Sequence, residues 1–190
     1  MLLGLALLAV ASCSPIPIEN IDWVDDGGGF IRFKTNDPER ADQRFVKLYP
    51  TATAMPLEVT MKKVLGTVGG GYGIVFHALN DKIYWKVLIS VTGMYKIARV
   101  SGGSDVTPYV WTDSPQLIRD YNKENRIKIT YASPIFTLWI NDVYQTEFFD
   151  EGLTGGPSVF YAYVGTVSDE YLPAGQVDVR FKMTSPEAHP

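Results

Sequence analysis

Apolar and polar residues alternate with a period of two along most of this 190-residue chain. The pattern recurs in ten segments, which are Phe30–Lys34, Leu57–Val64, Gly71–Ala78, Ile83–Ser90, Met94–Val100, Ile127–Tyr131, Phe136–Ile140, Tyr144–Phe149, Val159–Val164 and Val177–Met183. Successive side chains of an extended strand point to opposite faces, so each such segment has one apolar face to bury. The single helical candidate, 115–121, covers at most about two turns. The pattern therefore predicts an all-β protein.

Short polar or glycine-containing connections separate several of these segments. Asn80-Asp81, Thr92-Gly93 and Asn141-Asp142 are residue types that hairpin turns use. About ten strands with one apolar face each can bury those faces when two antiparallel sheets pack together. No boundary divides residues 30–183. We therefore expect one domain at 30–190, an antiparallel two-sheet β-sandwich.

The N-terminal segment carries a targeting pattern. Residues 1–11 are uncharged and apolar, but they are too few to span a bilayer as a helix. They end in Val10-Ala11-Ser12-Cys13, which resembles the lipobox of bacterial lipoproteins, and Cys13 is the only cysteine. The resemblance implies a signal peptide at 1–12, an acylated Cys13 with a tether at 13–29, and sorting to the outer membrane. We expect a lipid-anchored protein of the bacterial cell envelope whose anchor partner is the membrane; the alternative is a buried N-terminal helix with an incidental cysteine.

Composition excludes several kinds of site. The chain has 17 Lys+Arg against 21 Asp+Glu, and this net charge of −4 argues against a nucleic-acid partner held by phosphate neutralisation. One cysteine and two histidines exclude disulfide scaffolds and Cys- or His-rich metal sites. Five carboxylates near the expected turns could supply oxygen ligands for calcium, and they are Asp142, Asp150, Glu151, Asp169 and Glu170. No spaced Asp/Asn loop signature supports a calcium site. We therefore expect neither a cofactor nor a metal.

The middle of the chain resembles a known fold family. The segments that carry the likeness are Gly71-Tyr72-Gly73-Ile74-Val75-Phe76, Tyr84-Trp85-Lys86-Val87-Leu88-Ile89-Ser90, Gly93-Met94-Tyr95-Lys96-Ile97 and Leu138-Trp139-Ile140-Asn141-Asp142. They resemble the concanavalin A-like jelly-roll modules found in bacterial lipoproteins and beside glycan-degrading enzymes. The resemblance covers roughly residues 55–183 and implies a jelly roll. The resemblance does not indicate one function, because lectins, laminin G-like adhesion modules and hydrolases all have this fold.

Catalytic patterns are not found in the sequence. Hydrolases of this fold carry carboxylates at alternate positions of one strand, which places nucleophile and acid in the same cleft. Glu147, Asp150 and Glu151 lack that spacing, because the two-residue gap between Glu147 and Asp150 puts these two carboxylates on opposite faces of a strand. No nucleophile-elbow motif accompanies His77, and the glycine run at 66–73 lacks the Lys-Ser/Thr of a P-loop. We expect no catalytic residues, and a glycoside hydrolase is the third hypothesis.

Alternation assigns two tryptophans to opposite faces of their strands. Trp85 shares its parity with Ile83, Val87 and Ile89, which predicts a core position. Trp139 lies between the apolar Leu138 and Ile140, so its indole is expected on the outward face. The alternative is that Trp139 packs beneath a loop.

Outward aromatic side chains are the main indication of function. Sugar rings stack their C–H faces on Trp or Tyr while nearby polar groups bind the hydroxyls. Alternation places Tyr84 and Lys86 on the outward face of their strand, and it places His77 on the outward face of the preceding strand. Together with Trp139 they are the candidate ligand-binding residues, and they form one patch if their strands are neighbours. We expect a non-catalytic binding module with a glycan as first candidate ligand; the alternative is a structural or adhesive envelope lipoprotein that contacts another protein.

Overall fold

The computed structural model describes residues 24–25, 28–35, 43–47, 56–80, 83–102, 104–106, 110–149, 161–167 and 177–183. The expected signal peptide at 1–12, Cys13 and the tether as far as residue 23 lie outside the described residues, so the lipid anchor stays a prediction. All regular structure in the described part of the chain is strand. No helix there has the length and apolarity that crossing a bilayer requires.

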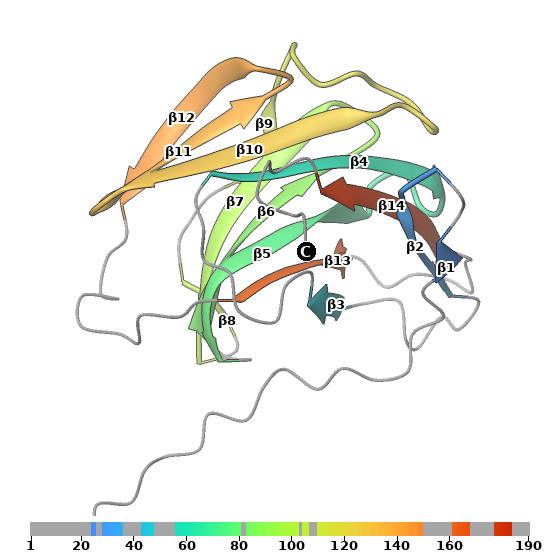
Figure 1. Cartoon of the computed structure of the whole chain (residues 1–190). Coiled ribbons are helices and arrows are strands. Elements are labelled where there is room, and N and C mark those ends of the chain that lie inside the picture. Colours follow the sequence, from blue (N-terminus) through green and yellow to red (C-terminus); the bar gives the residue numbers. More distant parts are fainter. Residues whose placement is uncertain are drawn as a thin grey trace, which may run out of the picture.

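The strands form two antiparallel sheets, and Figure 1 shows sheet A arching over sheet B. Sheet A has the order β1 (Val24–Asp25), β2 (Ile31–Thr35), β14 (Val177–Met183), β4 (Leu57–Leu65), β10 (Asn125–Ala132), β11 (Ile135–Ile140) and β12 (Val143–Phe149). Sheet B has the order β3 (Gln43–Lys47), β13 (Tyr161–Val167), β5 (Gly71–Asn80), β6 (Ile83–Ile89), β7 (Met94–Ser101) and β8 (Ser104–Asp105), and β9 (Thr112–Asp113) also pairs with β7. The predicted two-sheet antiparallel β-sandwich is therefore confirmed.

The ten predicted strands coincide with β2, β4 to β7 and β10 to β14. The four strands that alternation missed, β1, β3, β8 and β9, are two to five residues long. So few residues give alternation little room to appear, and their pairing depends on neighbours distant in sequence. The helical candidate at 115–121 is wrong, because this segment forms turns that connect the two sheets.

The core lies between the sheets and is rich in aromatic side chains. Burial alternates along all of β11 and along the first six residues of β10, as a strand with one covered face requires. Phe136 stacks on Phe148 with ring centroids 5.3 Å apart, and Trp85 of sheet B lies 5.0 Å from Phe148. Trp85 is only 1% exposed, which confirms its predicted core position. Contacts of this kind across the sandwich hold the sheets at a fixed separation.

The first prediction concerns the core. Trp85→Ala should lower the free energy of unfolding by about 3–5 kcal/mol, because it leaves a cavity beside Phe136 and Phe148. Urea or thermal unfolding measures the loss. Phe149→Ala is the control, since Phe149 is 59% exposed and its truncation should cost under ~1 kcal/mol. Equal losses in the two variants would contradict the assignment.

Candidate functional site

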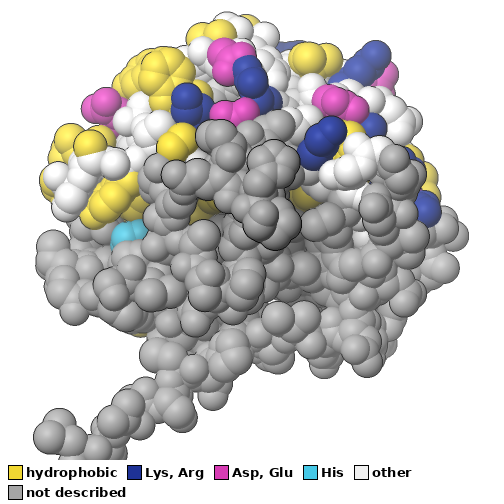
Figure 2. Space-filling model, viewed as in Figure 1, with side chains coloured by type: hydrophobic (Ala, Val, Ile, Leu, Met, Phe, Trp, Pro, Cys, Tyr) yellow, Lys and Arg dark blue, Asp and Glu magenta, His cyan; other side chains and the backbone are white. Residues whose placement is uncertain are grey.

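Six side chains form a two-row surface on the outer face of sheet A, which we call the Trp139 face. In the first row the paired positions are Lys128 on β10, Trp139 on β11 and Tyr144 on β12. In the second row they are Thr130, Thr137 and Glu147 on the same three strands. Neighbouring strands lie about 4.8 Å apart and alternate residues of one strand about 7 Å apart, so the six positions form a regular grid. Figure 2 shows hydrophobic, basic and acidic side chains interspersed over the upper side of the molecule, where these strands lie in Figure 1.

A β-bulge brings Tyr144 onto this face. The register shifts between Leu138 and Trp139, so that Leu138 pairs with Thr146 but Trp139 pairs with Tyr144. Simple alternation would place Tyr144 on the core side with Phe148, which is 1% exposed. The extra residue, Gln145, exchanges the two faces, and Tyr144 becomes 51% exposed. Alternation could not identify Tyr144 as a surface residue, because nothing in the local sequence marks the bulge.

Trp139 and Tyr144 form an aromatic pair in this surface. Their ring centroids are 5.8 Å apart and their planes are inclined by 81°, the edge-to-face arrangement that aromatic quadrupoles favour. Trp139 is half-buried on the outward side of its strand, which confirms the predicted direction of its side chain. Its indole nitrogen Nε1 is buried and finds no acceptor among the described residues. A buried donor without an acceptor costs free energy and calls for an explanation.

Four polar side chains around this pair have no side-chain partner in the described part of the chain. Lys128, Thr130, Thr137 and Glu147 form neither ion pairs nor side-chain hydrogen bonds to other described side chains. The contrast is the nearby Arg126, whose guanidinium pairs with Glu58 at 3.4 Å and also with Asp142. The Trp139 face therefore combines exposed ring surface with donors and acceptors that a ligand could satisfy.

The turn between β11 and β12 is fixed by a buried amide network. Asn141 and Asp142 have φ of 49° and 68°, the left-handed pair that a type I′ hairpin turn needs and that Asn and Asp tolerate. Asn141 Nδ2 donates to the Gln116 carbonyl at 2.7 Å and to Asn125 Oδ1 at 2.9 Å. Asn125 in turn holds both backbone groups of Ile118. The turn therefore starts β12 in the register that pairs Val143 with Ile140 and Tyr144 with Trp139.

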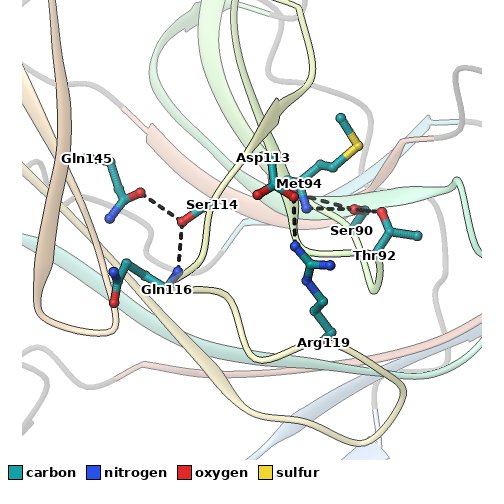
Figure 3. Close-up of polar contacts among 8 residues, drawn as sticks. All are labelled: Ser90, Thr92, Met94, Asp113, Ser114, Gln116, Arg119 and Gln145. Carbon is teal, nitrogen blue, oxygen red and sulfur yellow. Dashed lines mark hydrogen bonds and ion pairs between the residues drawn. The ribbon is translucent and has the colours of Figure 1, made fainter.

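A second set of polar contacts ties the edge of β12 to the loop that follows β9 (Figure 3). Ser114 donates through Oγ to Gln145 Oε1 at 2.8 Å and accepts a hydrogen bond from the Gln116 amide at 3.3 Å. Asp113 and Arg119 form an exposed ion pair at 2.8 Å in the same loop. No histidine or carboxylate contacts Ser114 in these hydrogen bonds, so they are structural links rather than a nucleophile and its base.

The other predicted binding residues lie elsewhere. Tyr84 and Lys86 do face away from the core on β6, but this side of sheet B is covered, and they are 5% and 4% exposed. Lys86 Nζ pairs with Asp105 Oδ1 at 2.9 Å. The prediction of a patch shared with Trp139 is wrong, because β6 belongs to sheet B and β11 to sheet A. Whether Tyr84 and Lys86 bind a ligand stays a prediction.

His77 departs from its predicted direction. Its φ is 49°, and the pairing of β5 with β6 is irregular between Phe76 and Asn80. The imidazole lies 5.2 Å from the Phe136 ring and 5.6 Å from the Tyr131 ring, both on sheet A. The irregularity turns the side chain from the outer parity toward the opposite sheet. His77 is therefore a buried neighbour of the core and has no place in the Trp139 face.

The described residues contain no group of three or more His, Cys, Asp or Glu side chains that could hold a metal. Asp142, one of the calcium candidates, pairs with Arg126. Asp150, Glu151, Asp169 and Glu170 lie outside the described residues. The calcium hypothesis gains no support from the described part of the chain.

A lysine occupies a core-facing position beside the amide network. Lys63 has the parity of the buried Val59 and Met61, and its Nζ donates to the carbonyls of Thr67 at 2.6 Å and Gly70 at 2.8 Å. Burial lowers the pKa of Lys63 to about 8, because the ammonium loses its water without gaining a carboxylate. A neutral amine still has two N–H groups, so both carbonyls keep a donor.

The second prediction follows from this shift. The unfolded chain retains the ordinary lysine pKa, so between pH 8 and about 10 it binds more protons at Lys63 than the folded chain does. Lys63 should therefore add a rise in the free energy of unfolding with pH over this window. Burial raises the pKa of Tyr72 and Tyr95, so these phenols hold protons longer in the folded chain and add a fall near pH 10. Lys63→Met keeps this fall but lacks the rise, so the free energy of unfolding of the wild type should increase relative to that of Lys63→Met between pH 8 and about 10. Urea unfolding at several pH values compares the two slopes, and parallel curves would contradict the prediction.

Comparison with known proteins concerns the fold. No protein-family model matches the sequence, and no curated protein does. The structure is similar to the carbohydrate-binding module CBM66 from Bacillus subtilis, with a TM-score of 0.61 and 16% identity over 86% of this chain and 89% of that one. It is also similar to a cysteine-substituted alginate lyase A1-II′, with a TM-score of 0.57 and 13% identity over 88% and 82% of the two chains. That lyase is a member of polysaccharide lyase family 7. The chain therefore has the jelly-roll β-sandwich fold that the sequence resemblance implied.

Proposed function

We propose that this chain is a glycan-binding module whose ligand lies on the Trp139 face. The observation that carries the proposal is the half-exposed pair of Trp139 and Tyr144, surrounded by four polar side chains that form no ion pair or side-chain hydrogen bond with other described side chains. Aromatic rings offer a flat apolar surface to the C–H groups of a sugar, and the hydroxyls then need donors and acceptors nearby.

Each of the six side chains of the Trp139 face would have a role in binding. Trp139 and Tyr144 would stack on the sugar rings, and Thr130 and Thr137 would exchange hydrogen bonds with sugar hydroxyls. Lys128 would donate and Glu147 would accept, which gives the surface both kinds of partner. The similarity to a carbohydrate-binding module supports this reading at the level of fold.

We propose further that binding is the whole activity, with no chemical step. The alginate lyase similarity makes this a question for experiment. Purified protein incubated with alginate and with neutral polysaccharides should release no reducing ends and no unsaturated sugar. Release of either product would show an enzyme.

The third prediction tests the binding surface. Trp139→Ala should weaken glycan binding by about 1–3 kcal/mol, because it removes the stacking surface, while unfolding stability should fall by less than ~1 kcal/mol. A glycan array identifies the ligand, and calorimetric titration with thermal unfolding gives the two losses. Leu65→Ala is the control, since it removes an exposed apolar side chain of sheet A that lies on β4, seven residues along the strand from Glu58, the partner of Lys128. A large loss of stability with unchanged affinity would indicate a structural Trp139, and binding of a protein instead of any glycan would favour the adhesive alternative.

We also propose that Cys13 carries a lipid that holds the module at the bacterial envelope. The support is the lipobox-like Val10-Ala11-Ser12-Cys13 after an uncharged apolar segment. Acyl chains contribute about 0.8 kcal/mol for each buried CH₂, so an acylated terminus anchors the module firmly.

The fourth prediction tests this anchor. Cys13→Ser should abolish acylation, because a hydroxyl does not replace the thiol as lipid acceptor, and the protein should leave the detergent phase in a partitioning assay. Ser14→Ala retains the cysteine and should partition like the wild type. Retention of the Cys13→Ser protein in the detergent phase would rule out the lipid anchor.

A further inference from the structure

The edge of β12 is shaped against pairing with another strand. Among the described strands, β12 is the last of sheet A and pairs with β11 alone. Gln145 Nε2 donates to the carbonyls of Val143 at 3.0 Å and Tyr144 at 3.2 Å, and Thr146 Oγ1 donates to the Glu147 carbonyl at 3.3 Å. Bulges and side chains that occupy edge carbonyls are devices that keep a sheet edge from adding a strand. This edge therefore disfavours a protein partner that would bind by strand addition.

The same edge joins the Trp139 face to the end of sheet B. Gln145 accepts the hydrogen bond of Ser114, and the Ser114 amide donates to the Gly93 carbonyl at 2.9 Å. Gly93 lies at the start of β7, two residues before Tyr95. Figure 3 shows Gln145, Ser114 and Met94 in one neighbourhood. These hydrogen bonds therefore place the edge of β12 beside the residues that precede β7.

Tyr95 is the next aromatic residue along this route. Its ring packs against the core cluster, which leaves the side chain half-buried and well held. Burial raises the pKa of Tyr95, and the Tyr144 phenol raises it further. Asp113 pairs with Met94, the residue before Tyr95. Its carboxylate forms the exposed ion pair with Arg119. Tyr95 thus lies at the end of sheet B that these hydrogen bonds join to the β12 edge, on the core-facing side of β7.

We propose that the binding surface continues from the Trp139 face over the β12 edge to Tyr95, and that it takes an internal stretch of an extended glycan chain lying across the strands. This inference rests on the proposed function. Lys128 and Tyr144 are two strand spacings apart, about 10 Å, so the first row alone exceeds what a single terminal sugar would need. Additional sugar units would then contact Tyr144 and Tyr95 in turn.

The experiment measures affinity against chain length. Alginate oligosaccharides and cello-oligosaccharides of two, four and six units serve as acidic and neutral probes in titrations with the full-length protein. In the series that binds, the affinity should rise at least about tenfold from two units to six. Tyr95→Phe should lower the affinity for six units about three- to tenfold and leave that for two units unchanged, whereas Trp139→Ala should lower both.

Tyr121→Phe is the matched control. It also removes a phenol hydroxyl from a ring that packs on the core, but that hydroxyl bonds to the Gly66 carbonyl at 2.6 Å. Its affinity for six units should equal that of the wild type. Equal affinity for two and six units, or no effect of Tyr95→Phe on six units, would overturn the extended surface while leaving glycan binding on the Trp139 face intact. Failure of both series to bind at every length would overturn the proposed function as well.

Discussion

Phe136 makes the contacts on which the register of the sandwich depends. Its ring lies within 4.5 to 6.3 Å of five other aromatic rings, which are Phe76, His77, Trp85, Tyr131 and Phe148. Three of these belong to sheet B and two to sheet A, so one side chain joins both layers. Because a one-residue slip of β11 would move Phe136 to solvent, its burial fixes the parity of the whole strand. Trp139, three residues further along, must then face outwards.

Two irregularities alter what this register would otherwise produce. In β12 one additional residue carries Tyr144 to the outer face beside Trp139, and in β5 an irregular pairing turns His77 toward Phe136. Each breaks the strand alternation at one point and is held by contacts made elsewhere in the chain. For β12 these contacts are the Asn141 turn and the Gln145–Ser114 hydrogen bond. The candidate site therefore exists because the regular ladder is interrupted at one place.

The polar groups of the molecule divide between support and recognition. Asn125, Asn141 and Lys63 are committed to backbone groups within the sandwich end, where an unsatisfied amide would be costly. Lys128 and Glu147 have no such commitments. A surface can bind sugar hydroxyls only with groups that are not already used, and this difference is what favours the Trp139 face over the ion-paired Lys86 on sheet B.

The amino-acid sequence alone determined ten of the described strands, that Trp85 is internal, that Trp139 is external and that Asn141-Asp142 turns the chain. These properties follow from alternation and turn chemistry, which are local and can be read along the chain. Only the tertiary structure decided that Tyr144 joins Trp139, that His77 turns inward and that Tyr84 and Lys86 are covered. Bulges, sheet membership and the covering of a second sheet face depend on contacts between residues far apart in sequence. A period-two pattern does not predict such contacts, because it assigns each side chain to one of two strand faces but does not indicate what packs against either face.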